Sequence, residues 1–345
     1  MAQAGCGTHQ ARIVDRSGAT IAEADVLTEV EWTRELDEFS SARVLIRPSG
    51  DCCNRLERVE PWRHELHVFR DGQPVWNGPV IQPEWRAGQI EIFAADILAW
   101  LDRRVPHRSQ TFGDSDLTDI ATWLIEDGFE PDDPGHELYV VAPSRVTGGR
   151  AYTVNVGQTG DHLRDLAETG LDYTAVGRTV ILLPEDYTGS VGRLTDADFP
   201  EELVVGQDGS NLITRWVVAG DEDSGVMGEA GGVDPYYGLL ERYEEQTSIK
   251  TAGSAIAAAR AKLRASLPAP VFVDTQQVTI SPDAAVDVAK LVPGWCLDVT
   301  TEATCRVVTQ RMKIVGLKVS EDGGTDSSPG QESVQVQLAA TGAEA

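Results

Sequence analysis

Residues 62–81 of the chain read WRHELHVFRDGQPVWNGPVI, and this stretch decides the fold class. Apolar and polar side chains alternate on both sides of Asp71-Gly72, which is the period of a half-buried strand. Glycine after aspartate supplies the positive φ that a tight hairpin turn requires. The stretch therefore predicts an antiparallel β hairpin, with strands at residues 62–69 and 75–81.

The same alternation extends outward from Arg12 to about Arg104, for example in residues 29–32 and 42–47. Glycine, proline and aspartate break it into short runs, as they do between the strands of small barrels and sandwiches. The pattern predicts an N-terminal β-barrel domain over residues 1–104.

The apolar period becomes that of helices between residues 105 and 194. One helix face is formed by Leu117, Ile120, Ala121, Leu124 and Ile125. We expect Asp114 or Ser115 to cap this helix and Gly128 to end it. A second helix is predicted at residues 161–169, before a hairpin that turns at Gly177-Arg178. These elements predict a small α+β domain over residues 105–194.

Residues 195–345 return to strands and are predicted to form a C-terminal domain. A strand at residues 212–219 leads into an exposed, glycine- and acid-rich loop at residues 220–232. A helix at residues 252–267, ended by prolines, precedes the strands of a second β barrel. Residues 321–330 are expected to form a loose loop.

An internal repeat links the two β regions. Residues 59–68 and 291–299 share a proline, a tryptophan and an alternating apolar strand in the same order. Each run is followed by a glycine-bearing strand, with Gly78 and Gly316 in matching roles, and then by a closing alternating strand. The repeat predicts a mainly β fold in which two similar barrels flank the α+β domain.

The charge balance limits the function classes. Lysine and arginine total 29 against 55 acidic residues, a net charge of −26. A field of this sign repels nucleic acid and anionic membranes, which argues against specific nucleic-acid binding. It favours colloidal solubility, and it also suits the wall of a channel that DNA passes through. Because no stretch approaches 18 consecutive apolar residues, stable membrane insertion is not expected, and the N-terminus predicts synthesis in a cytoplasm without a signal peptide.

The sequence contains few candidates for a catalytic or metal-binding site. His64-Glu65-Leu66-His67 lacks the zinc-protease spacing, and a strand places Glu65 and His67 together on a solvated or interface face. The cysteines form an odd set that we expect to be free thiols, with the adjacent pair buried: Cys6, Cys52, Cys53, Cys296 and Cys305. Residues 221–225, DEDSG, do not complete a calcium-binding frame and favour a solvated loop over a calcium site.

The eight tryptophans are expected in the core or at subunit interfaces rather than at a sugar-binding surface, since they lie within alternating runs: Trp32, Trp62, Trp76, Trp85, Trp100, Trp123, Trp216 and Trp295. The sequence has no GxSxG, P-loop or GxGxxG motif. We therefore predict no catalytic residue, no metal ligand and no cofactor.

Several of these runs resemble a known family. The runs are residues 32–36 (WTREL) and 39–42 (FSSA), Pro61-Trp62 entering a strand, and the segment from Asp71 to Val80. They are similar to minor tail proteins of long-tailed phages of actinobacteria. Across nearly the whole chain, the order of barrel, insert and second barrel resembles the baseplate hub family at the tip of contractile and siphophage tails.

The resemblance implies a structural virion protein at the tail tip. It implies a homotrimer in which two similar barrels per subunit give six quasi-equivalent positions, so that a six-fold tube is adapted to a three-fold tip. Implied partners are the distal tail protein, the tape measure protein and fibre or spike proteins, with DNA only in transit. Larger relatives add a peptidase or wall-degrading domain after the second barrel, and a non-enzymatic role is expected here.

Two other functions compete with the hub. A hexameric distal tail protein is the first, but it has no need for the repeat between Trp62 and Trp295. A tail-associated peptidoglycan hydrolase or peptidase is the second, and it requires a cleft with tuned acid, base or metal groups. Subunit mass and cell-wall clearing distinguish the three.

Overall fold

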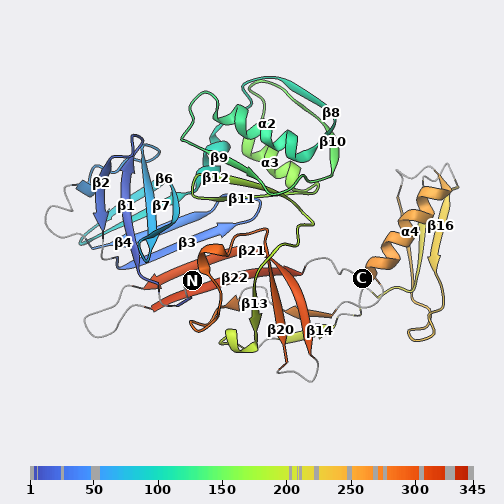
Figure 1. Cartoon of the computed structure of the whole chain (residues 1–345). Helices are drawn as coiled ribbons and strands as arrows, with labels where there is room; N and C mark the ends of the chain where they lie inside the picture. The colour runs from blue at the N-terminus through green and yellow to red at the C-terminus, as the bar shows by residue number, and fades with distance from the viewer. Residues whose placement is uncertain are drawn as a thin grey trace. The chain divides into compact units, whose positions relative to one another are not determined.

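The computed structural model describes residues 4–5, 7–24, 27–47, 55–201, 204–207, 209, 212–220, 225–246, 251–266, 271–274, 278–302, 307–322 and 331–340. The chain forms two compact units (Figure 1). Unit 1 comprises Met1–Glu202 and Thr275–Ala339, and unit 2 comprises Leu203–Asp274 with the last six residues. No helix among the described residues is long and apolar enough to cross a membrane.

The predicted hairpin is present. Strand β5 (His64–Arg70) pairs antiparallel with β6 (Gln73–Arg86), and both turn residues adopt the left-handed conformation, with φ of 51° at Asp71 and 74° at Gly72. Two consecutive left-handed residues match the twist of the flanking strands, which is why Asp-Gly closes the turn. β6 runs five residues beyond the predicted end and pairs with β7 after a register shift near Val80.

Most strands of unit 1 belong to one twelve-stranded sheet, which confirms the mainly β prediction. Its order is β13-β20-β21-β3-β4-β7-β6-β5-β1-β2, and β22 pairs with both β21 and β19. The remaining bounds are β1 His9–Asp15, β2 Thr20–Ala24, β3 Glu29–Glu35, β4 Ser41–Ile46, β7 Gln89–Ala95, β13 Ser190–Thr195, β19 Val278–Thr279, β20 Cys296–Thr301, β21 Val308–Asp322 and β22 Gln331–Ala340. Short 3-10 turns lie at Asp196–Asp198 and Val288–Lys290.

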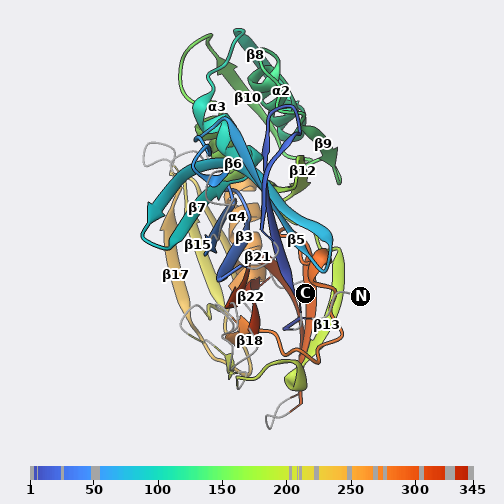
Figure 2. The same cartoon turned by 90° about the vertical axis from the view of Figure 1, so that its left-hand side faces the viewer.

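Strand β21 joins the two β regions within this sheet. Its first half pairs with β20, and its second half pairs with β3, from Gly316 opposite Glu35 to Asp322 opposite Glu29. β6 behaves in the same way, because it pairs first with β5 and then with β7 (Figure 2). β21 extends through the first two residues of the loop expected at 321–330, and the rest of that stretch lies outside the described residues.

The internal repeat has a structural counterpart. Trp62 and Gly294 each follow a proline, and both have a left-handed φ, of 61° and 91°. Their N–H groups donate to the carbonyls of Val80 in β6 and Ile314 in β21, at 2.8 Å each. The expected match between Gly78 and Gly316 is wrong, since Gly78 pairs with Leu66 of β5 whereas Gly316 pairs with Glu35 of β3.

The insert of unit 1 contains two helices and two small sheets. Helix α2 (Leu117–Phe129) buries the predicted apolar face, but its N-cap is Asp116 rather than Asp114 or Ser115. Gly128 lies inside the helix, where Leu101 and Thr159 pack closely against it. The other bounds are β8 Gln110–Asp116, β9 Glu137–Val140, β10 Thr147–Tyr152, α3 Thr159–Ala167, β11 Leu171–Val176 and β12 Thr179–Pro184, and the 3-10 helix η1 (Ile97–Arg103) comes just before the insert.

Unit 2 is built around a three-stranded sheet in the order β16-β15-β17 and helix α4 (Ala252–Ser266), close to the helix predicted at 252–267. β15 is Arg215–Ala219, β16 is Met227–Gly231, and β17 is Glu241–Glu245. A loop was expected throughout residues 220–232, and this is wrong for residues 227–231, which form β16 and pair with β15 over the full length of the strand. β14 (Val204–Gln207) and β18 (Val271–Asp274) form a separate antiparallel pair.

Candidate functional site

Buried charges hold the large sheet together near its N-terminal strand. Arg70 of β5 and Glu332 of β22 form a two-pronged ion pair, with Nε–Oε1 and Nη2–Oε2 distances of 2.6 and 2.7 Å. Their side chains are 1% and 0% exposed, so water does not screen the pair. The Gly7 N–H also donates to Glu332. Residues more than 260 positions apart are thereby fixed side by side.

His9 extends this cluster to β3 and β21. The indole N–H of Trp32 donates to His9 Nε2 at 3.1 Å, and an indole N–H can only donate. Nε2 is therefore the unprotonated nitrogen, and Nδ1 carries the proton that it donates to Glu321 at 2.7 Å. This chain of contacts fixes the imidazole orientation and connects three strands of the sheet.

The insert is attached to the large sheet at the β3–β4 turn. Asp37, with a φ of 62°, accepts the Tyr173 N–H at 2.9 Å, and the Tyr173 hydroxyl donates to the Asp37 carbonyl at 2.6 Å. Thr174 donates to the Glu35 carbonyl at 2.7 Å. Burial raises the pKa of Asp37 to about 7, although the Tyr173 N–H opposes the rise. The turn and β11 therefore form one hydrogen-bonded layer.

A second ion pair strengthens this attachment. Lys313 of β21 contacts Asp172 of β11 at 2.5 Å and also donates to the Glu185 carbonyl. Burial raises the pKa of Asp172, and the ammonium group of Lys313 limits the rise. The insert is thus tied to strands from both β regions, which favours a rigid scaffold in unit 1.

The His64–His67 stretch lies where β5 meets the insert. Glu65 is buried and accepts from Arg178 of the β11–β12 turn at 2.8 Å, and it contacts His67 at 3.2 Å. Burial opposes ionisation, but the bonds from His67 and Arg178 outweigh it and hold the pKa of Glu65 below its usual value. The expectation of a solvated face is wrong for Glu65, because its carboxylate is buried in a contact within the chain. His64 points to the opposite side and accepts the Glu60 N–H.

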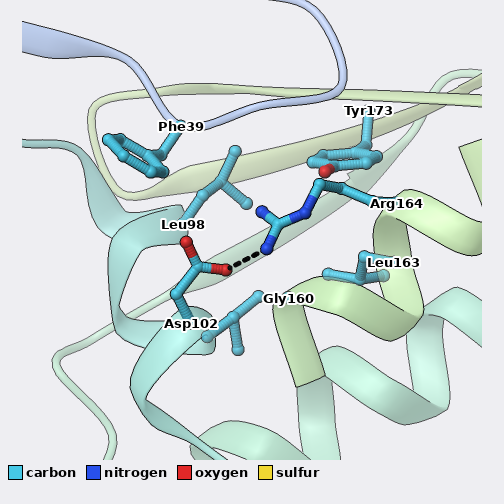
Figure 3. A pocket seen from close by; sticks show the side chains of 8 residues that line it. Phe39, Leu98, Asp102, Gly160, Leu163, Arg164 and Tyr173 are labelled. Atoms are coloured by element: carbon cyan, nitrogen blue, oxygen red, sulfur yellow. Dashed lines mark ion pairs between the residues drawn. The ribbon is translucent and has the colours of Figure 1, made fainter. Parts of the chain in front are cut away.

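A small cavity lies between the β3–β4 turn, η1 and α3 (Figure 3). Its volume is about 10 Å³, which is the space of one water molecule. Arg164 contacts Asp102 there at 3.1 Å, and Phe39 and Tyr173 close the apolar side. A shallower groove of about 290 Å³ runs over β3, β4, β6 and β7 beside Phe93. The cavity is too small to hold an organic substrate.

The other predicted candidates give no chemical site. Cys6, Cys52, Cys53 and Cys305 lie outside the described residues, as do residues 221–224 of the acidic loop. Cys296 is a buried free thiol, and burial raises its pKa. Among the residues whose placement is described, no three His, Cys, Asp or Glu side chains are grouped to hold a metal ion.

The eight tryptophans differ in burial. Trp32, Trp76 and Trp216 are buried, whereas Trp85 is half exposed. Sequence reasoning missed Arg70 and Glu332, although a signal exists. Both occupy strand positions of the same parity as buried valines and leucines, where a charge must find a partner.

No protein-family model and no curated protein matches the sequence. The fold is similar to that of the 43 kDa tail protein of prophage MuSo2 from Shewanella oneidensis, at 15% identity and a TM-score of 0.59, over 95% of this chain and 97% of that one. A tail protein from Neisseria meningitidis aligns at 12% identity and a TM-score of 0.56, over 95% and 96%.

The E. coli c3393 protein, a type VI secretion component with structural similarity to the T4 tail proteins gp27 and gp5, aligns at 10% identity and a TM-score of 0.51, over 91% of this chain and 73% of that one. At such identities the likeness concerns the fold, and function must be argued from the surfaces. In its architecture, the chain shares the mainly β fold of phage tail proteins along nearly its whole length.

Proposed function

We propose that this chain is a structural, non-enzymatic protein of a phage tail tip, a homotrimeric hub that surrounds the DNA channel. The observation that carries the proposal is the full-length likeness to tail proteins, which covers 95% of this chain and 97% of the Shewanella protein. The β regions within residues 1–104 and 195–345 supply the two quasi-equivalent ring positions, and residues 105–194 form the insert between them.

Three properties of the molecule support this role. The turns at Trp62 and Gly294 and the strands that follow them repeat one local geometry. The buried ion pairs join strands and insert within unit 1, which suits a structural role. The net charge of −26 keeps DNA from adhering to a channel wall. In this role the hub joins the distal tail and tape measure proteins to fibre or spike proteins in the virion.

The mass of the purified chain tests the proposal. Three copies of the 37.3 kDa chain give about 112 kDa by light scattering, and six give about 224 kDa. A trimer with three-fold class averages supports the hub. Six copies would instead favour the hexameric distal tail protein. A monomer at high concentration, together with clearing of host cell walls in zymograms, would refute both and favour a hydrolase.

A further inference from the structure

Unit 2 has two unlike faces. α4 covers one face of the three-stranded sheet, where Trp216 and Val218 are buried and Gly228 meets the helix backbone (Figure 1). Strand alternation places the intervening residues on the other, open sheet face, which we define as Arg215, Val217, Ala219, Met227, Glu229, Glu241, Tyr243 and Glu245. A sheet normally packs against another layer on each apolar face.

The open sheet face is apolar at its centre and acidic at its rim. Met227 is 53% exposed, and Tyr243 is 55% exposed. Val217 is opposite Tyr243 on one side and Glu229 on the other, so two apolar side chains lie next to each other on β15 and β17. The three glutamates outnumber Arg215, the basic residue on this face, which already pairs with Glu229 and Glu241. The face keeps an excess of negative charge and therefore attracts a partner with basic side chains.

The outer face of α4 has that character. Ala252, Gly253, Ala257 and Arg260 are exposed, and the last three follow the helical spacing of four and three residues. Small side chains let a helix approach a sheet closely, and Arg260 supplies a positive charge. Residues 246–273 contain four basic and no acidic residues, whereas the rest of the chain has 25 basic and 55 acidic residues. The segment that contains α4 is thus exceptional in this protein for its excess of basic residues, of which Arg260 lies on the outer face of the helix.

We propose that the outer face of α4 in one copy docks onto the open sheet face of unit 2 in the next copy. Each sheet is then enclosed between its own α4 and that of a neighbour. The two faces differ, so the contact is heterologous, and such contacts form a ring when the rotation from one copy to the next closes, as it does in a trimer. The sheet measures only about 16 by 14 Å, which is too small for a stable interface alone. The docking therefore adds to a trimer of the proposed hub, on which this inference rests.

Two variants test the helix face and the sheet face independently. Arg260→Glu disables the helix face, and the double variant Met227→Ser/Tyr243→Ser disables the sheet face. Lys290→Glu and Val307→Ser are matched controls in unit 1, because both residues are exposed. Circular dichroism and urea midpoints verify that each variant folds. We expect each test variant to raise the dissociation constant of the trimer at least ten-fold, as measured by sedimentation, and the controls to leave it unchanged.

Mixing the two test variants gives the sharper readout. A mixture retains one intact helix-to-sheet contact per pair and should yield one-to-one complexes at concentrations where each variant alone is monomeric. Trimers that persist in both variants with the wild-type constant would overturn the docking and leave the hub proposal intact. A wild-type chain that stays monomeric would overturn both. A mixture without pairs would overturn the heterologous geometry.

Discussion

Replacing Arg70 with methionine should destabilise unit 1 by about 3–5 kcal/mol, because it leaves a buried carboxylate without its partner. Methionine fills similar space, so the loss is electrostatic rather than a cavity. Glu332 is 0% exposed and accepts two bonds from Arg70, whereas the single remaining donor with a described bond to it is the Gly7 N–H. The double variant Arg70→Met/Glu332→Met removes both charges, so it should lower the free energy of unfolding by less than Arg70→Met alone.

Urea unfolding followed by tryptophan fluorescence measures this effect, since seven of the eight tryptophans lie in unit 1. Arg12→Met is the matched control, because the Arg12–Glu23 pair bridges neighbouring strands with side chains 38% and 49% exposed. Such exposed pairs contribute about 1 kcal/mol or less. Equal shifts for Arg12→Met and Arg70→Met, or a double variant worse than the single one, would refute the reasoning.

Other perturbations test the remaining contacts. Gly78→Ala places a Cβ 1.9 Å from the Ala95 carbonyl and should lower the urea midpoint of unit 1, whereas Gly113→Ala meets open space and should not. The pKa of Asp37, raised to about 7, makes the folded state bind the extra proton between about pH 4 and 7, so this group's contribution to stability falls as pH rises through that window. Asp37→Asn should accordingly gain stability relative to wild type from pH 5 to pH 8, and a pH-independent difference would contradict the burial argument. Gly228→Val brings its side chain to within 2.2 Å of the α4 backbone and should expose α4 to trypsin, while unit 1 stays resistant.

Local patterns in the sequence predicted most elements. The Asp71-Gly72 turn, α2 and the hairpin at Gly177 depend on neighbours within a few residues, so periodicity and turn chemistry suffice. The observed N-cap of α2, Asp116, lies one or two residues after the predicted caps. Asp116 also accepts hydrogen bonds from Ser144 and Arg145, which are distant in sequence. Element ends depend on such tertiary partners.

Long-range pairing could not be predicted in the same way. Alternation shows that β3 and β21 are strands, but any two alternating strands are compatible in pattern, and nothing local selects one partner over another. The ion pairs of Arg70 and Lys313 likewise join residues more than 100 positions apart. A charged residue at a buried strand position indicates that an oppositely charged partner exists, but it does not identify that partner.

The pairing of β3 with β21 has a consequence for synthesis. The two strands are about 280 residues apart, and ribosomes add roughly 5–20 residues per second, so β3 waits roughly 15 to 60 s for its neighbour. Throughout that interval one edge of β3 can recruit strands of other nascent chains. A fragment that ends before residue 308 never receives this neighbour and should accumulate in inclusion bodies. Chaperones that cover this edge during synthesis therefore favour correct folding of the chain.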